Sequence, residues 1–140
     1  MSGNDDLMEQ LHGVMFAFRS EMRRAMQDAG HSMNGMEVRA LLWISSHANA
    51  TARELAQHGG RDKAQITRVI QQLEQAELVT RAPDPDDRRV QRLALSAQGE
   101  ALVATLKRER QVVSARMLGK LTKAEQAQLA GLLARLLPAA

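Results

Sequence analysis

Apolar residues recur with helical periodicity over most of this chain, and polar residues at the ends of these stretches mark where helices begin and end. The first such stretch runs from about Asp5 to Ala29 and predicts a long amphipathic helix that ends near Gly30. Asn34, followed three residues later by Glu37, predicts the start of a second helix. Because the middle of this second helix is apolar on nearly all sides, we expect it to be central and buried.

The middle of the chain predicts two shorter helices separated by a turn. Thr51 and Glu54 form a capping-box pattern, which predicts a helix over about 51–57. Gly59 and Gly60 are expected to end it, since glycine tolerates the left-handed conformation of a tight exit. A fourth helix follows over about 62–76, and its apolar positions fall on one side.

A pair of strands is predicted directly after this helix. Residues 78–81 predict one strand and residues 90–95 predict its partner, with Leu93 and Leu95 on one side. Pro83 and Pro85 are expected to keep the connecting loop out of regular pairing. Two helices joined by a turn and backed by a hairpin can place one helix in the DNA major groove and the hairpin tip in the minor groove.

The last third of the chain predicts two more helices. Ser96 is expected to cap a helix over about 97–117, and Thr122 with Glu125 caps another whose leucines form a strong apolar stripe. These terminal helices carry more apolar surface than one small core can bury. A second copy of the chain would cover the surplus. The alternative is an ordinary intramolecular core, to which part of each stripe must belong.

The outer face of the fourth helix is rich in amides and contains no carboxylate. A solvated face would more often mix Glu and Lys, so this bias favours a contact with nucleic acid. Arg68 can donate two hydrogen bonds to guanine, Gln65, Gln71 or Gln72 can pair with adenine or reach phosphate, and Lys63 and Thr67 suit phosphate oxygens. The alternative is an ordinary wet surface. The face comprises Ala64, Arg68, Gln71 and Gln75, flanked by Arg61, Gln65, Thr67 and Gln72.

The loop over 84–89 is crowded with charge. An arginine at a hairpin tip can enter a narrow minor groove, where the electrostatic potential is most negative. A carboxylate beside it can hold the guanidinium in a bidentate grip, so Asp87 is better interpreted as a brace than as a DNA contact. The alternative is an ordinary charged turn.

Composition excludes several classes of protein. The length of 140 residues indicates one domain, and the absence of cysteine excludes disulfides and thiol chemistry within the chain. With 19 basic and 16 acidic residues the net charge of +3 is compatible with nucleic acid. The only aromatic residues are Phe16, Phe18 and Trp43, which disfavours stacking on single strands. We expect no signal peptide, no membrane segment and a cytoplasmic location.

The four histidines, His12, His31, His47 and His58, lack the spacing or cysteine partners of a strong metal site. We therefore expect no metal and no cofactor, with metal sensing as an alternative. Ser45, Ser46 and His47 are consecutive and do not form a nucleophile–base pair by adjacency alone. The glycines at 59 and 60 lack the spacing of a phosphate-binding loop. An enzyme is not expected.

Two segments carry a resemblance to a known family. Residues 87–99, Asp-Arg-Arg-Val-Gln-Arg-Leu-Ala-Leu-Ser-Ala-Gln-Gly, resemble the wing of the MarR family (multiple antibiotic resistance regulators), Asp-x-Arg-x-x-x-Leu-x-Leu-Thr-x-x-Gly. Residues 67–79 are similar to the recognition helix of that family and its exit. Ser96 stands where threonine is usual, and Ala76 with Glu77 where the family often has Lys-Gly.

The resemblance implies a mostly α fold with a small β-wing. It would be a winged helix-turn-helix of about six helices that forms a homodimer through its N- and C-terminal helices. Residues 1–140 would form a single domain, with about 34–99 as the DNA-binding lobe and about 5–33 and 97–140 as dimerisation helices. Asp87 would brace Arg89, which would probe the minor groove, and Arg53 would face phosphate. The residues expected at DNA are Arg53, Lys63, Ala64, Gln65, Thr67, Arg68, Gln71, Gln72, Asp87, Arg88 and Arg89.

The resemblance implies a ligand-responsive transcriptional repressor that binds a pseudo-palindromic duplex operator. The resemblance also implies a small amphipathic, often phenolic, effector bound between the dimerisation helices and the lobe. Met15, Phe16, Met36 and Trp43 are the pocket walls expected there, although such residues at helical spacing also fit an ordinary core. The alternative function is a winged-helix module that binds a protein or a small ligand and has no DNA function.

Overall fold

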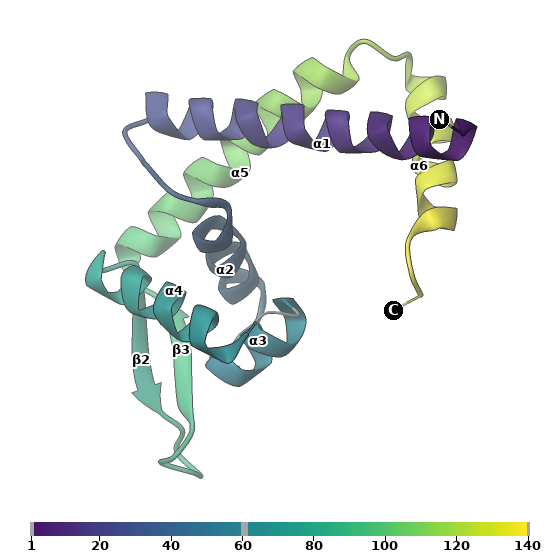
Figure 1. The fold of residues 1–140 in the computed structure, drawn as a ribbon. Helices are drawn as coiled ribbons and strands as arrows, with labels where there is room; N and C mark the ends of the chain where they lie inside the picture. The colour runs from purple at the N-terminus through teal and green to yellow at the C-terminus, as the bar shows by residue number, and fades with distance from the viewer. Residues whose placement is uncertain (1, 60–61, 140) are drawn as a thin grey trace. The chain divides into compact units, whose positions relative to one another are not determined.

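The structure, a computed structural model, describes residues 2–59 and 62–139. This part of the chain forms six helices and three strands (Figure 1). Gly60, expected to help end the third helix, and Arg61, expected beside the exposed face of the fourth, lie outside the described residues. The elements are α1 (Gly3–Asp28), α2 (Gly35–Ser46), β1 (Ala50–Thr51), α3 (Ala52–Gly59), α4 (Lys63–Gln75), β2 (Val79–Pro83), β3 (Gln91–Leu95), α5 (Ala97–Leu118) and α6 (Lys123–Leu136).

The chain divides into two compact units. Unit 1 comprises residues 1–22 and 109–140, and unit 2 comprises residues 23–108. Unit 2 therefore contains α2, α3, α4 and all three strands. It holds every element that the sequence predicted for the helix-turn-helix and its hairpin.

The core of unit 2 is built around α2, as the apolar middle of that helix predicted. Leu41 on α2 and Ile70 on α4 are fully inaccessible to solvent, as is Leu93 on β3. The apolar stripe predicted on α4 is buried as well, so that the opposite side of this helix faces outward. Burial of such side chains contributes about 1.5–3 kcal/mol each, which orients α4 against the core.

Local capping defines where the helices of unit 2 begin. The Asn34 side chain accepts a hydrogen bond from the Glu37 amide at 2.9 Å and donates one to the Glu37 carboxylate at 2.6 Å. Asp62 accepts from the Ala64 amide at 3.1 Å. These caps satisfy N–H groups that have no partner inside the helix. The predicted starts of α2 and α4 are confirmed.

The sheet is antiparallel, with the strand order β1-β3-β2. β2 and β3 form the predicted hairpin, which extends beyond α4 in Figure 1. β1 was not predicted, because two residues are too short to show an alternating pattern. The expectation for Pro83 was wrong: it is the last residue of β2 and lies opposite Gln91. An edge strand accommodates proline because its outer N–H groups need no partner.

Unit 1 is helical, and much of its apolar surface is exposed. Among the described residues, the large apolar side chains that are exposed all belong to this unit. Phe16 on α1, Leu136 at the end of α6 and Leu137, which follows that helix, are each about two-thirds exposed or more. The predicted capping box of α6 is present, with Thr122 and Glu125 each accepting from the backbone of the other. Among the helices of residues 2–59 and 62–139, none combines the length and the apolar composition of a membrane-spanning segment.

Candidate nucleic-acid interface

The outward face of α4 carries the side chains that the sequence predicted for DNA. Each of these residues is exposed, whereas the stripe on the opposite side is buried. The Thr67 hydroxyl donates to the Lys63 carbonyl at 2.9 Å, so only its lone pairs remain for a partner. The exposed residues are Lys63, Ala64, Gln65, Thr67, Arg68, Gln71 and Gln72.

Arg53 is exposed in the first turn of α3, the helix that precedes α4. Thr51 caps the start of α3 as predicted, because its hydroxyl accepts from the Glu54 amide at 3.1 Å. The second bond differs from that of a capping box: the Glu54 carboxylate accepts from the Thr51 hydroxyl at 3.0 Å, whereas in a capping box it accepts from the backbone amide. The free amides and dipole of such a helix start favour anions. Arg53 adds a positive charge at the same end.

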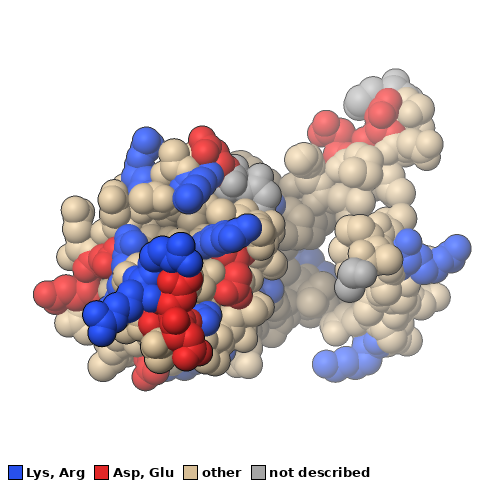
Figure 2. Space-filling model, turned by 90° about the horizontal axis from the view of Figure 1, so that it is seen from below, with Lys and Arg blue, Asp and Glu red and all other residues tan. Residues whose placement is uncertain are grey.

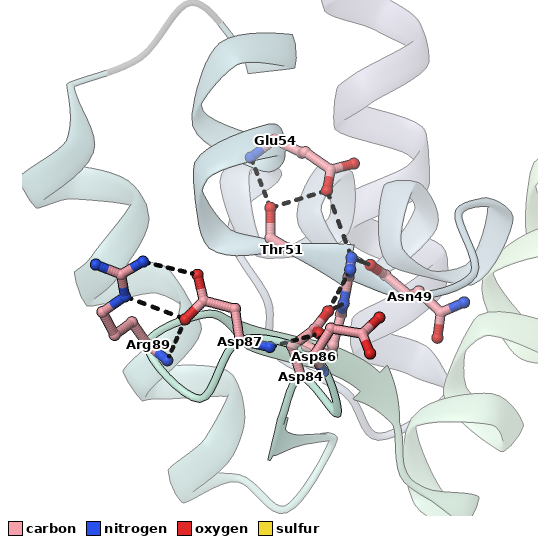
Figure 3. Close-up of polar contacts among 8 residues, drawn as sticks. Asn49, Thr51, Glu54, Asp84, Asp86, Asp87 and Arg89 are labelled. Atoms are coloured by element: carbon pink, nitrogen blue, oxygen red, sulfur yellow. Dashed lines mark hydrogen bonds and ion pairs between the residues drawn. The ribbon is translucent and has the colours of Figure 1, made fainter.

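The tip of the hairpin presents Arg89 in a defined geometry (Figure 3). Both oxygens of Asp87 accept from its guanidinium, Oδ1 from Nε at 3.1 Å and Oδ2 from Nη2 at 3.2 Å. Oδ1 also accepts from the Arg89 backbone amide at 3.1 Å. The Arg89 guanidinium and amide hold the pKa of the Asp87 carboxyl below its ordinary value. Arg88 and Arg89 are both exposed.

Asp84 organises the same loop from inside, a role that sequence reasoning did not assign to it. It is buried, and its Oδ1 accepts from the amides of Asp86 at 2.7 Å and Asp87 at 3.1 Å. These bonds and the Arg92 guanidinium lower the pKa of the Asp84 carboxyl, with the Asp86 amide as the largest cause. An aspartate that bonds to backbone amides two and three residues later is a common way to shape a turn.

Arg92 was also missed, although it contacts more elements than any other arginine described above. It lies on the central strand β3 and donates through Nε to Asp84 at 2.6 Å and through Nη1 to the Asn49 carbonyl at 2.6 Å. Glu54 on α3 is 3.9 Å from the same Nη1. The partners are distant in sequence from Arg92, so no local pattern could have identified it.

A second ion pair joins α4 to the hairpin. Nε of Arg81 on β2 donates to Oε1 of Glu74 on α4 at 2.7 Å, and Nη2 is also 2.7 Å from that oxygen. Glu74 is the only carboxylate on α4, and Arg81 neutralises it. This pair therefore reduces the repulsion that Glu74 would exert on a polyanion at α4.

The wing side of unit 2 is rich in basic side chains (Figure 2). Lys and Arg gather there around a strip of carboxylates, in the view from below Figure 1. The two carboxylates of this loop with lowered pKa values, Asp84 and Asp87, are each paired with an arginine. Pairing limits their repulsion of phosphate, which makes the surface suitable for a polyanion.

The residues predicted to line an effector pocket fall in different units. Met15 and Phe16 are exposed on α1 in unit 1. In unit 2, Met36 is half-buried against the core, and Trp43 is buried with its ring stacked on His47 at a centroid distance of 4.2 Å. The pocket itself stays a prediction.

An open hollow of about 350 Å³ lies within unit 1, where α5 ends and α6 begins, and none of the four predicted pocket walls lines it. In the part of the chain that the structure describes, no three His, Asp or Glu side chains are grouped so that they could hold a metal ion.

Comparison with known proteins agrees with this architecture. The model of the MarR family matches residues 33–90. Two relatives from Bacillus subtilis (strain 168) align with nearly the whole chain. The uncharacterized HTH-type transcriptional regulator YdgJ is 30% identical over 132 residues, which cover 94% of this chain and 77% of YdgJ. The HTH-type transcriptional repressor MdtR is 27% identical over 135 residues, or 96% of this chain and 86% of MdtR.

Solved structures share the fold over almost the full length. YusO from Bacillus subtilis superposes with a TM-score of 0.72 at 25% identity and 97% coverage of both chains. A mutant MarR from E. coli complexed with operator DNA gives a TM-score of 0.81 at 24% identity, with 95% of this chain and 94% of that chain covered.

The architecture of unit 2, with α3 and α4 joined by a turn and flanked by the β2–β3 hairpin, defines a winged helix-turn-helix protein. The chain belongs to the MarR family of transcriptional regulators.

Proposed function

We propose that this protein is a transcriptional repressor that binds a pseudo-palindromic duplex operator as a homodimer and releases it when a small amphipathic effector binds. The observation that carries the DNA-binding part is the pairing of two exposed features on unit 2. One is the outer face of α4, and the other is Arg89, aimed by Asp87. The relatives described above include a named repressor and a protein solved with operator DNA.

The α4 face supplies the groups for the major groove. Arg68 would pair with guanine, and Gln65, Gln71 and Gln72 would reach adenine or phosphate. Lys63, Thr67 and Arg53 would contact phosphate, while Ala64 leaves room for a base edge or a thymine methyl group. Arg89 would enter the adjacent minor groove, and Arg88 would contact the DNA backbone beside it.

The exposed apolar side chains of unit 1 support the homodimer. Side chains such as Leu132 at 58% and Leu136 at 66% exposure are unfavourable in water. A second copy would bury them in a twofold interface built from the N- and C-terminal helices, about 5–33 and 97–140. The lobe of about 34–99 would then be presented twice, with the two α4 helices about 34 Å apart, one turn of duplex.

The effector would act through this spacing. A ligand changes occupancy of the operator only if it binds more tightly to a dimer whose α4 helices are wrongly spaced. Met15, Phe16, Met36 and Trp43 are the proposed apolar walls, and a phenolic or similar amphipathic compound matches their chemistry. We place the site of action in the cytoplasm, where a bacterial operator is accessible.

Selection of duplexes from a random pool, followed by a salt series on the enriched site, tests the proposal. We expect an enriched site with twofold symmetry and an affinity that falls steeply with salt, because contacts to phosphate release counterions. Sedimentation of the free protein should give a dimer. A flat response to salt, or no enrichment, would instead favour a winged-helix module that binds a protein or a small ligand without DNA.

A further inference from the structure

The hairpin carries Arg89 at its tip, beyond the last paired residues of the two strands. The ladder of β2 and β3 ends with Pro83 opposite Gln91. Between them the loop is closed by two backbone bonds, from the Asp84 amide to the Val90 carbonyl at 2.9 Å and from the Val90 amide to the Asp87 carbonyl at 3.0 Å. These bonds shape the loop but do not tie it to the helices of unit 2.

Arg92 supplies such a tie. On the central strand it lies opposite Thr51 of β1 on one side and Ala82 of β2 on the other. Its guanidinium bonds to the Asn49 carbonyl before β1 and to Asp84 in the wing loop, and lies 3.9 Å from Glu54 in the first turn of α3. One side chain therefore connects the wing to the start of the helix-turn-helix.

A continuous series of polar contacts leads from this cluster to the tip (Figure 3). Arg92 holds Oδ2 of Asp84, while Oδ1 of Asp84 accepts from the Asp87 amide at 3.1 Å. Asp87 in turn grips the Arg89 guanidinium with both oxygens. Because Asp84 is buried and fully engaged, a shift of Arg92 would move the segment that carries Asp87 and Arg89.

Arg92 is not itself well placed to be a DNA contact. Its side chain is 35% exposed, compared with 90% for Arg89. All three nitrogens of its guanidinium lie against protein groups. Nε and Nη2 are paired with Asp84, and Nη1 with the Asn49 carbonyl and Glu54. Arginine suits this task, since its planar fork holds several acceptors in fixed directions and lysine cannot.

We propose that Arg92 is a positioning residue for duplex binding: through Asp84 it fixes the wing to β1 and α3, and so sets the direction in which Arg89 enters the minor groove. This inference rests on the proposed function, in which the wing contacts DNA. It names the residue that orients the wing for that contact. It assigns Arg92 an effect on the wing contact alone, not on the contacts of α4.

A double-mutant cycle with the full chain and the selected duplex tests this assignment. Arg92→Met should lower affinity about tenfold in the native background and less than about twofold when Arg89→Ala is also present, since the contact it positions is then absent. Asp84→Asn, which breaks the same tie from the other side, should show the same dependence on Arg89. Arg92→Lys should recover only part of the affinity.

Arg53→Met is the matched control, because it removes one exposed positive charge from the same unit. Its loss of affinity should be equal in both backgrounds. Thermal unfolding of each variant gives the folded fraction by which affinities are corrected, and Asp84→Asn replaces Arg92→Met if the latter does not fold. An equal effect of Arg92→Met with and without Arg89 overturns this inference while leaving the proposed function intact. Failure of the native protein to bind any duplex overturns both.

Discussion

Asp87 holds Arg89 by three hydrogen bonds of 3.1 to 3.2 Å, yet the Arg89 side chain is 90% exposed. An ion pair in this setting contributes little to folding, because water screens it and two side chains lose freedom. What the pair does provide is direction. Because Asp87 holds the Arg89 guanidinium in an outward orientation in the free protein, less conformational entropy is lost on binding.

Replacement of Arg89 should therefore affect binding and not stability. We expect Arg89→Ala to lower affinity for the selected duplex by at least about fivefold, as loss of one good contact costs roughly 1–3 kcal/mol, and to leave the unfolding temperature within about 1 °C. Fluorescence anisotropy and thermal unfolding measure the two. Lys120→Ala, an exposed change outside the wing, should leave binding unaltered. Duplex affinity equal to that of the native protein in Arg89→Ala would rule out the minor-groove role.

The buried carboxylate of Asp84 predicts a dependence of stability on pH. Its pKa is lower in the folded protein than the ordinary value of 3.8, chiefly because of the Asp86 amide and the Arg92 guanidinium. A lowered pKa stabilises the fold above the ordinary value, and this contribution is lost as the pH falls through the folded pKa. The native protein should thus exceed Asp84→Asn in unfolding free energy at pH 7, by a margin that shrinks below pH 3.8.

Urea unfolding of both proteins from pH 7 downward measures this margin. Asp86→Asn is the control, because the structure shows its backbone amide, rather than its carboxylate, bonded to Asp84. That variant should track the native protein at every pH. A margin for Asp84→Asn that does not change with pH would show that the carboxylate charge contributes nothing.

Glu77 occupies a backbone conformation that suits glycine. It follows α4 with a φ of 60°, and bonds from Glu77 to the Glu74 carbonyl and from Leu78 to the Leu73 carbonyl close the helix around it. A side chain in the left-handed region costs about 1 kcal/mol. Glu77→Gly should therefore raise the free energy of unfolding by up to about 1 kcal/mol, measured by urea unfolding. Glu77→Ala, which keeps a Cβ, should give no such gain, and an equal gain in both variants would assign the effect to loss of the charge.

Gly99 lies where α5 approaches the backbone of Leu78. A Cβ at this position would be 2.1 Å from the Leu78 carbonyl oxygen, which is backbone and cannot move aside. That oxygen also accepts from the Ser96 amide at 3.0 Å, so α5 and the start of β2 would be forced apart. We expect Gly99→Ala to destabilise the protein by about 1–3 kcal/mol, as overpacking does. Gly35→Ala, where nothing lies within 4 Å, should be close to neutral in the same unfolding assay.

The departure from the family pattern at residues 76 and 77 thus has a structural answer. The sequence showed that the usual glycine of the helix exit was missing, and the structure shows Glu77 taking the left-handed conformation in its place. Ser96, the other departure, accepts from the Gly99 amide at 3.0 Å and caps α5 as threonine would.

The sequence by itself determined what is local. Caps such as Asn34 with Glu37, the buried stripe of α4 and the grip of Asp87 on Arg89 each join residues at most four positions apart or on one helical face. Such pairs meet wherever the backbone is regular, because helix and turn geometry alone brings them together. The sequence could therefore predict which side of α4 is exposed and that Asp87 grips Arg89, whereas their role at DNA stays a prediction.

Only the tertiary structure decided which distant groups would share a partner. Arg92 and Asn49 are 43 positions apart, and they meet because β1, two residues long, pairs with β3. Arg81 and Glu74 meet because β2 follows α4 after a short turn and contacts it. An arginine in a sequence shows its charge but not its acceptors. Its role is set by which carboxylates and carbonyls the packed core brings within reach of its guanidinium, and packing is a property of the whole chain.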